Sequence, residues 1–299
     1  MVESESPVID AIDMEILMHR DVHFGGSFDV MIEYYQQNGV GVMPDFTIKE
    51  LEKLKNFENQ MGKNLADTFL PEAALSIVNT AKILYQTLRE VYSEKKPEPY
   101  ALLLNDLILS EEDPPEKEMQ ALINQGSKIV PSLIHLLSSQ DFYDPLYPGY
   151  GRSPIFAAQC LGAIQDERAI PPLFEALGQD NFFTDEEVIK ALTAFGDKSK
   201  AFLLKRLKQE PLSKDNEYAA IALSGFPEDD EIAIASLEVL EKEATLKNTL
   251  FASYLIFACN SLTQASQQER LIAISKRKNL PKPILSEIAI VVKTWKKTV

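Results

Sequence analysis

Cysteine, histidine, tryptophan and glycine are all scarce in this chain of 299 residues. It has two cysteines, three histidines, one tryptophan and 12 glycines. Cys160 and Cys259 both lie in apolar stretches with helical spacing, which favours buried free thiols over a disulfide between them. We therefore expect buried free thiols and a cytoplasmic protein. Few glycines, together with few alternating apolar and polar runs, favour an all-α fold.

Long apolar runs and a basic leader are also missing. The longest apolar run, residues 250–259, is about half of the ~20 residues that a membrane-spanning helix needs. Glu3 and Glu5 stand where a secretory signal peptide would carry basic residues. We therefore expect no membrane span.

The charge of the chain is acidic and uneven. The net charge is −15, and residues 1–125 hold 23 acidic and 10 basic side chains, whereas residues 241–299 hold 4 and 10. Sequence-independent nucleic-acid binding by a whole chain needs a broad basic surface, so nucleic acid is not the expected partner. Nucleic-acid binding through the basic C-terminal helices, residues 276–297, is kept as a third alternative.

A repeat of 31 residues organises the middle of the chain. Leu161, Leu192 and Leu223 are 31 residues apart. The same spacing relates an apolar and an acidic series: Ile164, Phe195 and Phe226, and Asp166, Asp197 and Glu228. A fixed period of this size indicates stacked helix pairs that bury one another's apolar faces. Residues before 97 lack the period, so we expect an N-terminal helical domain over 1–96 and a repeat domain over 97–299.

The stretch LGAIQDERAIPPLFEAL, residues 161–177, is the best-marked joint between two such pairs. It resembles the joint of short HEAT-like repeats, a type first recognised in phycobilin lyases, and residues 126–133 are a second match. The resemblance covers residues 116–226 and continues more weakly to residue 296. It implies an all-α, right-handed HEAT-like solenoid. It specifies a fold better than an activity, because members of the family include scaffolds, lyases and a hydroxylase.

Two groups of residues are candidates for binding a partner. The first is the loop 141–152, which interrupts the repeat and combines aromatic residues with an arginine, the residue types that anchor interfaces. The second group occupies the equivalent loop of the next unit and the outer face of the second helix of each unit. The candidates are Phe142, Tyr143, Tyr147, Tyr150, Arg152, Phe156, Phe182, Phe183, Tyr218 and Ile221. At each place the alternative is packing against the protein's own helices.

Residue types that carry catalysis or bind metals are few. His19 and His23 are four residues apart, the spacing of two ligands on one helix face. Phe24, Gly25 and Gly26 follow at once and predict that the helix ends there, so we favour a capping or packing role and predict no metal and no cofactor. The sequence has no P-loop, dinucleotide fingerprint or nucleophile elbow.

These observations together predict a non-enzymatic adaptor. We expect it to bind a peptide or protein partner through the groove of the solenoid and the aromatic loop. A phycobilin-lyase-like enzyme or enzyme subunit, with the N-terminal segment forming part of its active site, is the runner-up.

Overall fold

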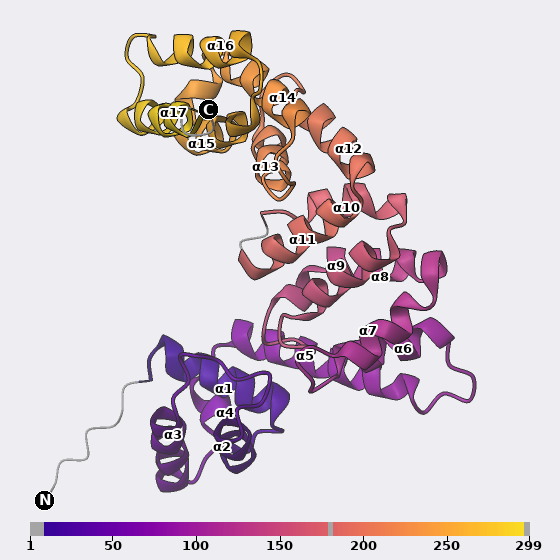
Figure 1. Ribbon diagram of the computed structural model, residues 1–299. Coiled ribbons are helices and arrows are strands. Elements are labelled where there is room, and N and C mark those ends of the chain that lie inside the picture. Colours follow the sequence, from indigo (N-terminus) through magenta and orange to yellow (C-terminus); the bar gives the residue numbers. More distant parts are fainter. Residues whose placement is uncertain (1–8, 179–181, 296–299) are drawn as a thin grey trace, which may run out of the picture. The chain divides into compact units, whose positions relative to one another are not determined.

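The computed structural model describes residues 9–178 and 182–295, and within these ranges the regular structure is helical, with no strand (Figure 1). The chain divides into two compact units, Met1–Cys160 and Leu161–Val299. The division falls inside helix α9 (Ser153–Ile164). The predicted boundary at residue 96 stays a prediction, and each unit is described by itself.

Unit 1 is built around helix α1 (Ala11–His23), which contacts α3 (Ile48–Met61), α4 (Leu65–Phe69) and α5 (Glu72–Val91). Its other helices are α2 (Phe28–Gln36), α6 (Pro99–Ile108), α7 (Glu116–Ile123), α8 (Val130–Ser138) and most of α9. A capping box explains the start of α3, because Thr47 and Glu50 each accept a hydrogen bond from the other's backbone amide.

A second capping box sets the start of α1. Asp10 and Asp13 each accept a hydrogen bond from the other's backbone amide, so the first turn begins at Ala11. Its end at His23 is as predicted, because Gly25 and Gly26 take positive φ angles of 59° and 79° that a helix cannot continue through.

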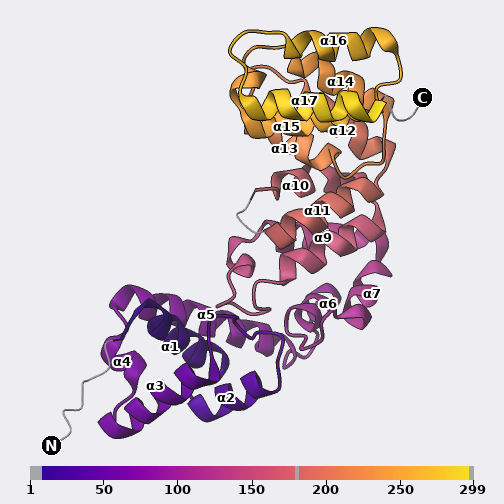
Figure 2. The ribbon, with the colours of Figure 1, turned by 60° about the vertical axis from the view of Figure 1, so that its left-hand side comes forward.

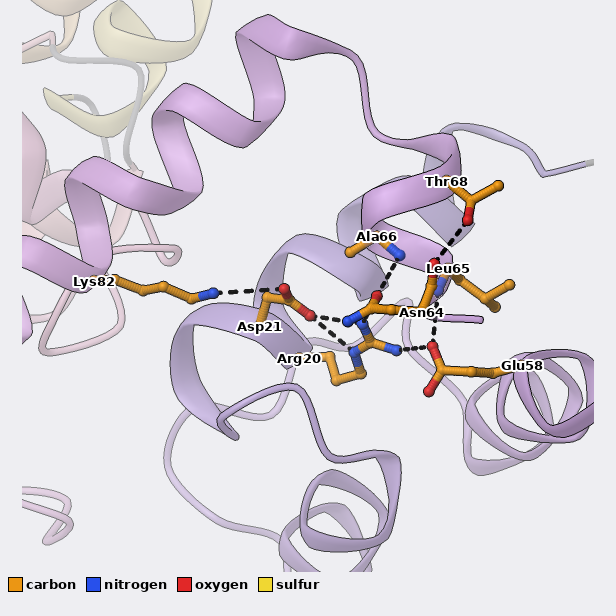
Figure 3. Close-up of polar contacts among 8 residues, drawn as sticks. All are labelled: Arg20, Asp21, Glu58, Asn64, Leu65, Ala66, Thr68 and Lys82. Atoms are coloured by element: carbon orange, nitrogen blue, oxygen red, sulfur yellow. Dashed lines mark hydrogen bonds and ion pairs between the residues drawn. The ribbon is translucent and has the colours of Figure 1, made fainter. Parts of the chain in front are cut away.

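A fully buried arginine ties α1 to the helices around it (Figure 3). The Nε and Nη2 atoms of Arg20 donate to Asp21 at 3.0 and 2.7 Å, and Nη2 also donates to the side-chain oxygen of Asn64 at 2.8 Å. Nη1 donates to Glu58 on α3, and the ring of Phe28 on α2 lies 4.6 Å from the guanidinium carbon. Because a buried charge is costly unless it is paired, these contacts fix α1 against α2 and α3.

The acceptors of Arg20 also begin α4. Glu58 accepts a hydrogen bond from the amide of Leu65, and Asn64 accepts one from the amide of Ala66. The unpaired amides at the start of this five-residue helix are thereby satisfied. The same two side chains thus cap α4 and accept hydrogen bonds from the buried guanidinium.

Unit 2 consists of successive helix pairs (Figure 2). The first helices are α10 (Ile170–Glu175), α12 (Asp197–Leu207), α14 (Asp230–Leu240) and α16 (Ala265–Ser275). The second helices are α11 (Phe182–Ala194), α13 (Lys214–Leu223), α15 (Thr249–Ala258) and α17 (Lys282–Trp295). Each second helix contacts the next second helix, and α12, α14 and α16 contact one another in the same order. This is the two-layer stacking of an α-solenoid.

The repeated leucines share one environment. Leu161, Leu192 and Leu223 are all buried, with exposed fractions of 0%, 0% and 3%. The predicted all-α solenoid is therefore confirmed. Both cysteines are buried free thiols, also as predicted, and burial raises the pKa of each to about 12.

Candidate functional site

The aromatic loop 141–152 packs against the protein's own N-terminal helices. Tyr147 is only 9% exposed and belongs to the apolar core that α1, α2 and α3 share. The ring of Tyr150 lies 4.8 Å from that of His23, and its hydroxyl donates to Glu111 at 3.0 Å. The hydroxyl of Tyr143 donates to the carbonyl of Leu137. The loop thus holds unit 1 together, and the rings of Phe142, Tyr143 and Tyr150 remain half-buried.

Arg152 and Phe156 follow the same pattern. The guanidinium of Arg152 donates to the carbonyls of Ser110 and Glu112 at 3.1 and 3.2 Å, and its carbon lies 5.5 Å from the ring of Phe156. Phe156 is 5% exposed, so it lies in the core rather than on the outer face that the repeat alignment predicts. The reason is the inserted loop, whose Arg152 covers the ring. Phe182 and Phe183 begin α11, but their side chains lie outside the described part of the chain.

The two histidines of α1 are side by side, with ring centroids 5.3 Å apart. Since the carbonyl of Pro145 can only accept, the Nε2 atom of His23 carries the proton, and Nδ1 then accepts from the hydroxyl of Tyr85 at 2.8 Å. Burial lowers the pKa of His19 to about 4, and burial together with the neighbouring His19 lowers that of His23 to about 3. Both rings are therefore neutral at pH 7.

No set of three metal-ligating side chains accompanies these histidines or occurs elsewhere in the described ranges. Both ring nitrogens of His23 already have protein partners. The contacts of the pair are those of packing.

The second helices of unit 2 carry a different surface. Four buried positions of α13 have buried equivalents 36 residues later: Asn216, Ala219, Ala220 and Leu223 correspond to Ala252, Leu255 and Ile256 of α15 and to Cys259, the residue after this helix. The same shift places Tyr218 on Tyr254 and Ile221 on Phe257. Equivalent outer positions on adjacent helices thus hold large apolar or aromatic side chains.

Three large apolar side chains on the last two second helices are strongly exposed. Leu250 and Phe257 on α15 have exposed fractions of 57% and 50%, and Ile290 on the adjacent α17 has 53%. Residues 250, 254 and 257 have the spacing of one helix face. We call the surface formed by Tyr218, Ile221, Leu250, Tyr254, Phe257 and Ile290 the second-helix face.

Tyr218 and Ile221, two of the candidates from the sequence, are half-buried on the second-helix face, and the other four residues of this face were not among the predicted candidates. The step between equivalent positions changes from 31 to 36 residues after α13, so the alignment lost its register. One signal was present: residues 250–259 are apolar almost throughout, on a helix that has no polar face to turn toward water.

A small cavity opens beside this face, between α13 and α15. Its volume is about 210 Å³, and it is lined by Tyr254 and Phe257, by Leu223 and by the acidic turn residues Glu228 and Asp229. Burial pushes the pKa of Asp229 up, but hydrogen bonds from the Ile232 amide and the Lys200 ammonium outweigh it. The pKa of Asp229 therefore lies below its ordinary value. Most of the cavity lining is apolar, the polar side chains of Ser224, Ser236, Asn260 and Ser261 contribute the rest, and two carboxylates lie at the adjoining turn.

Residues 153–224, which span α9 to α13, match the family model for HEAT repeats. No curated protein and no solved structure matches the chain. None of the described helices combines the length and the apolar character that crossing a membrane requires. HEAT repeats generally mediate protein–protein interactions, through the extended surfaces that stacked helix pairs create. Taken with its all-helical structure and stacked pairs, the match identifies this chain as a HEAT-like repeat protein.

Proposed function

We propose that this chain is a non-enzymatic protein-interaction module and that it binds a peptide or protein segment on the second-helix face. The observation that carries the proposal is the exposure of Leu250, Phe257 and Ile290 on two adjacent helices. A single exposed apolar side chain is ordinary, but several large ones on adjacent helices are typical of an interaction site.

The way the face is held supports this function. Behind the exposed side chains, α13 and α15 bury alanine and leucine in the unit core, so the helices present the face without rearranging. A surface that is already ordered loses less entropy on binding. Aromatic side chains such as Tyr218, Tyr254 and Phe257 are the type that supplies interface anchors, and a bound segment could lie across the three helices.

A photocrosslinking experiment tests the proposal. The photoreactive residue p-benzoylphenylalanine replaces Phe257 or Ile290 in the full-length chain, expressed in its native cells. The matched control carries it at Ile83, which is 63% exposed on α5 in unit 1. We expect the same crosslinked protein from positions 257 and 290 and not from position 83. Products that are shared by all three positions, or found at none, would contradict the proposal.

The same products bear on the alternatives. A crosslinked species that nuclease treatment removes would favour nucleic-acid binding, and a coloured product would favour the lyase-like enzyme. Both alternatives stay predictions.

A further inference from the structure

We infer that the segment bound on the second-helix face is basic and inserts one apolar side chain into the cavity between α13 and α15. This inference rests on the proposed function and adds the chemistry of the partner. It depends on three features of unit 2: the size of the cavity, the exposed rings at its mouth, and the charge of the adjoining turn.

The size of the cavity suits one side chain. Pockets for cofactors and drug-sized ligands measure about 300–1,000 Å³, whereas this cavity measures about 210 Å³. Tyr254 and Phe257 form one wall, and Leu223 from α13 contributes to the other. Phe257 is half exposed without a partner, so an inserted apolar side chain would bury its free side.

The turn beside the cavity is strongly acidic. Lys200 makes ion pairs with Asp197, Asp229 and Glu231 at 3.0–3.3 Å, so one ammonium serves three carboxylates. Glu228 and Asp230 accept hydrogen bonds from the neutral side chains of Asn260 and Thr263. The net charge of the acidic turn is −4, counted over Asp197, Lys200, Glu228, Asp229, Asp230 and Glu231.

This charge selects the class of occupant. Phosphates of nucleic acids and the anionic headgroups of membranes would be repelled by the acidic turn. A protein segment that places lysine or arginine beside Glu228 and Asp229, next to its apolar anchor, would satisfy both features of the site. Charges at the rim of an interface mainly raise the association rate and exclude wrong partners, so binding should weaken with salt.

Selection from a random library tests the inference without knowing the natural partner. A phage-displayed library of random 12-residue peptides is selected on the full-length chain, and enriched peptides are then measured by fluorescence polarisation. We expect peptides with a positive net charge and a large apolar residue. Their affinity should fall about tenfold or more in Phe257→Ser and in the double variant Glu228→Lys/Asp230→Lys.

A matched control separates position from total charge. The double variant Glu15→Lys/Glu52→Lys changes the net charge by the same amount at exposed positions of unit 1, and its affinity for the peptides should stay within about twofold of wild type. Circular dichroism melts verify that each variant is folded. Phe257, Glu228 and Asp230 contribute exposed or half-exposed side chains, so their replacement leaves the core intact.

The outcomes separate this inference from the proposed function. Two results overturn the inference and leave the proposed function standing. The first is that the enriched peptides are neutral or acidic. The second is that they lose affinity in Leu250→Ser and Ile290→Ser but not in Phe257→Ser or Glu228→Lys/Asp230→Lys. Enrichment no greater than background, or equal binding to every variant, overturns both. A dimer that is seen by sedimentation equilibrium and dissociates in Phe257→Ser makes the occupant a second copy and also overturns the inference.

Discussion

His19 and His23 make the stability of unit 1 depend on pH. Burial lowers their pKa values to about 4 and about 3, whereas an unfolded histidine titrates near 6.5. Between these values the unfolded chain binds more protons than the folded one. Stability is therefore fully present above about pH 6.5 and is lost as the pH falls toward 4, by about 1.4 kcal/mol per pH unit for each histidine.

Urea denaturation between pH 7.5 and 4.5 measures this loss. Carboxylates also titrate near the lower end, so the informative quantity is the difference between variants. We expect the double variant His19→Gln/His23→Gln to show a smaller change in the free energy of unfolding between pH 6.5 and 5 than wild type. The control His135→Gln, at an exposed position, should show the same change as wild type. A slope in the double variant equal to that of wild type would show that the two rings are not the source.

Arg20 is the side chain whose loss should cost unit 1 most. In Arg20→Met, Glu58 loses its cation and Asp21 keeps only the longer ion pair with Lys82 at 3.5 Å, which we expect to lower the free energy of unfolding by about 3–5 kcal/mol. The control Lys55→Met breaks the exposed pair with Asp29 and should cost under about 1 kcal/mol. Chemical denaturation of both variants provides the comparison, and equal losses would argue against the role of the buried network.

Helices whose ends carry their own signals were predictable from the sequence. The capping box at Thr47 sets the start of α3, and the glycines after His23 set the end of α1. Both act through neighbouring residues in the sequence and do not depend on the rest of the fold. The burial of Phe156 was not predictable in this way, because its cover comes from Arg152 in an inserted loop that the repeat pattern does not describe. The short helix α4 was missed because its cap depends on Asn64 and Glu58, which tertiary contacts with Arg20 position.

The approach of α9 to α11 depends on a glycine. A Cβ atom at Gly162 would lie 2.8 Å from the Cα atom of Ala191 and 3.0 Å from its Cβ atom. We therefore expect Gly162→Ala to force the two helices apart and to cost about 1–3 kcal/mol, although alanine is the better helix former. Thermal unfolding measures the change, with Ala163→Ser at the exposed neighbouring position as the control. A rise in melting temperature would show that the contact can relax.

Over the whole molecule, the three histidines are confined to unit 1. We therefore expect acidification from pH 7 to 5 to lower hydrogen-exchange protection in the helices around His19 and His23 more than in unit 2, after correction for intrinsic exchange rates. Mass spectrometry of peptic fragments resolves the two units. Equal loss in both would show that they unfold as one cooperative body.

The all-α solenoid was predictable because the period of 31 residues encodes which leucines are buried together. The second-helix face was only partly predictable. Phe257 lies 36 residues after Ile221, so an alignment with a constant period of 31 residues does not place the two at equivalent positions. Exposure is also a property of the folded chain: the apolar run over 250–259 does not reveal which of its members reach the surface.

The change of side-chain type along the second helices would give a direction to a segment bound as we propose. The outer positions hold Glu187 and Lys190 on α11 and become Tyr254 and Phe257 on α15, so a ligand reversed end for end would set its apolar residues against charges. Packed helices lie about 10 Å apart, and an extended chain advances about 3.3 Å per residue. A segment running across the helices would therefore meet a new one at about every third residue, and that interval is the spacing of anchors to look for in any partner.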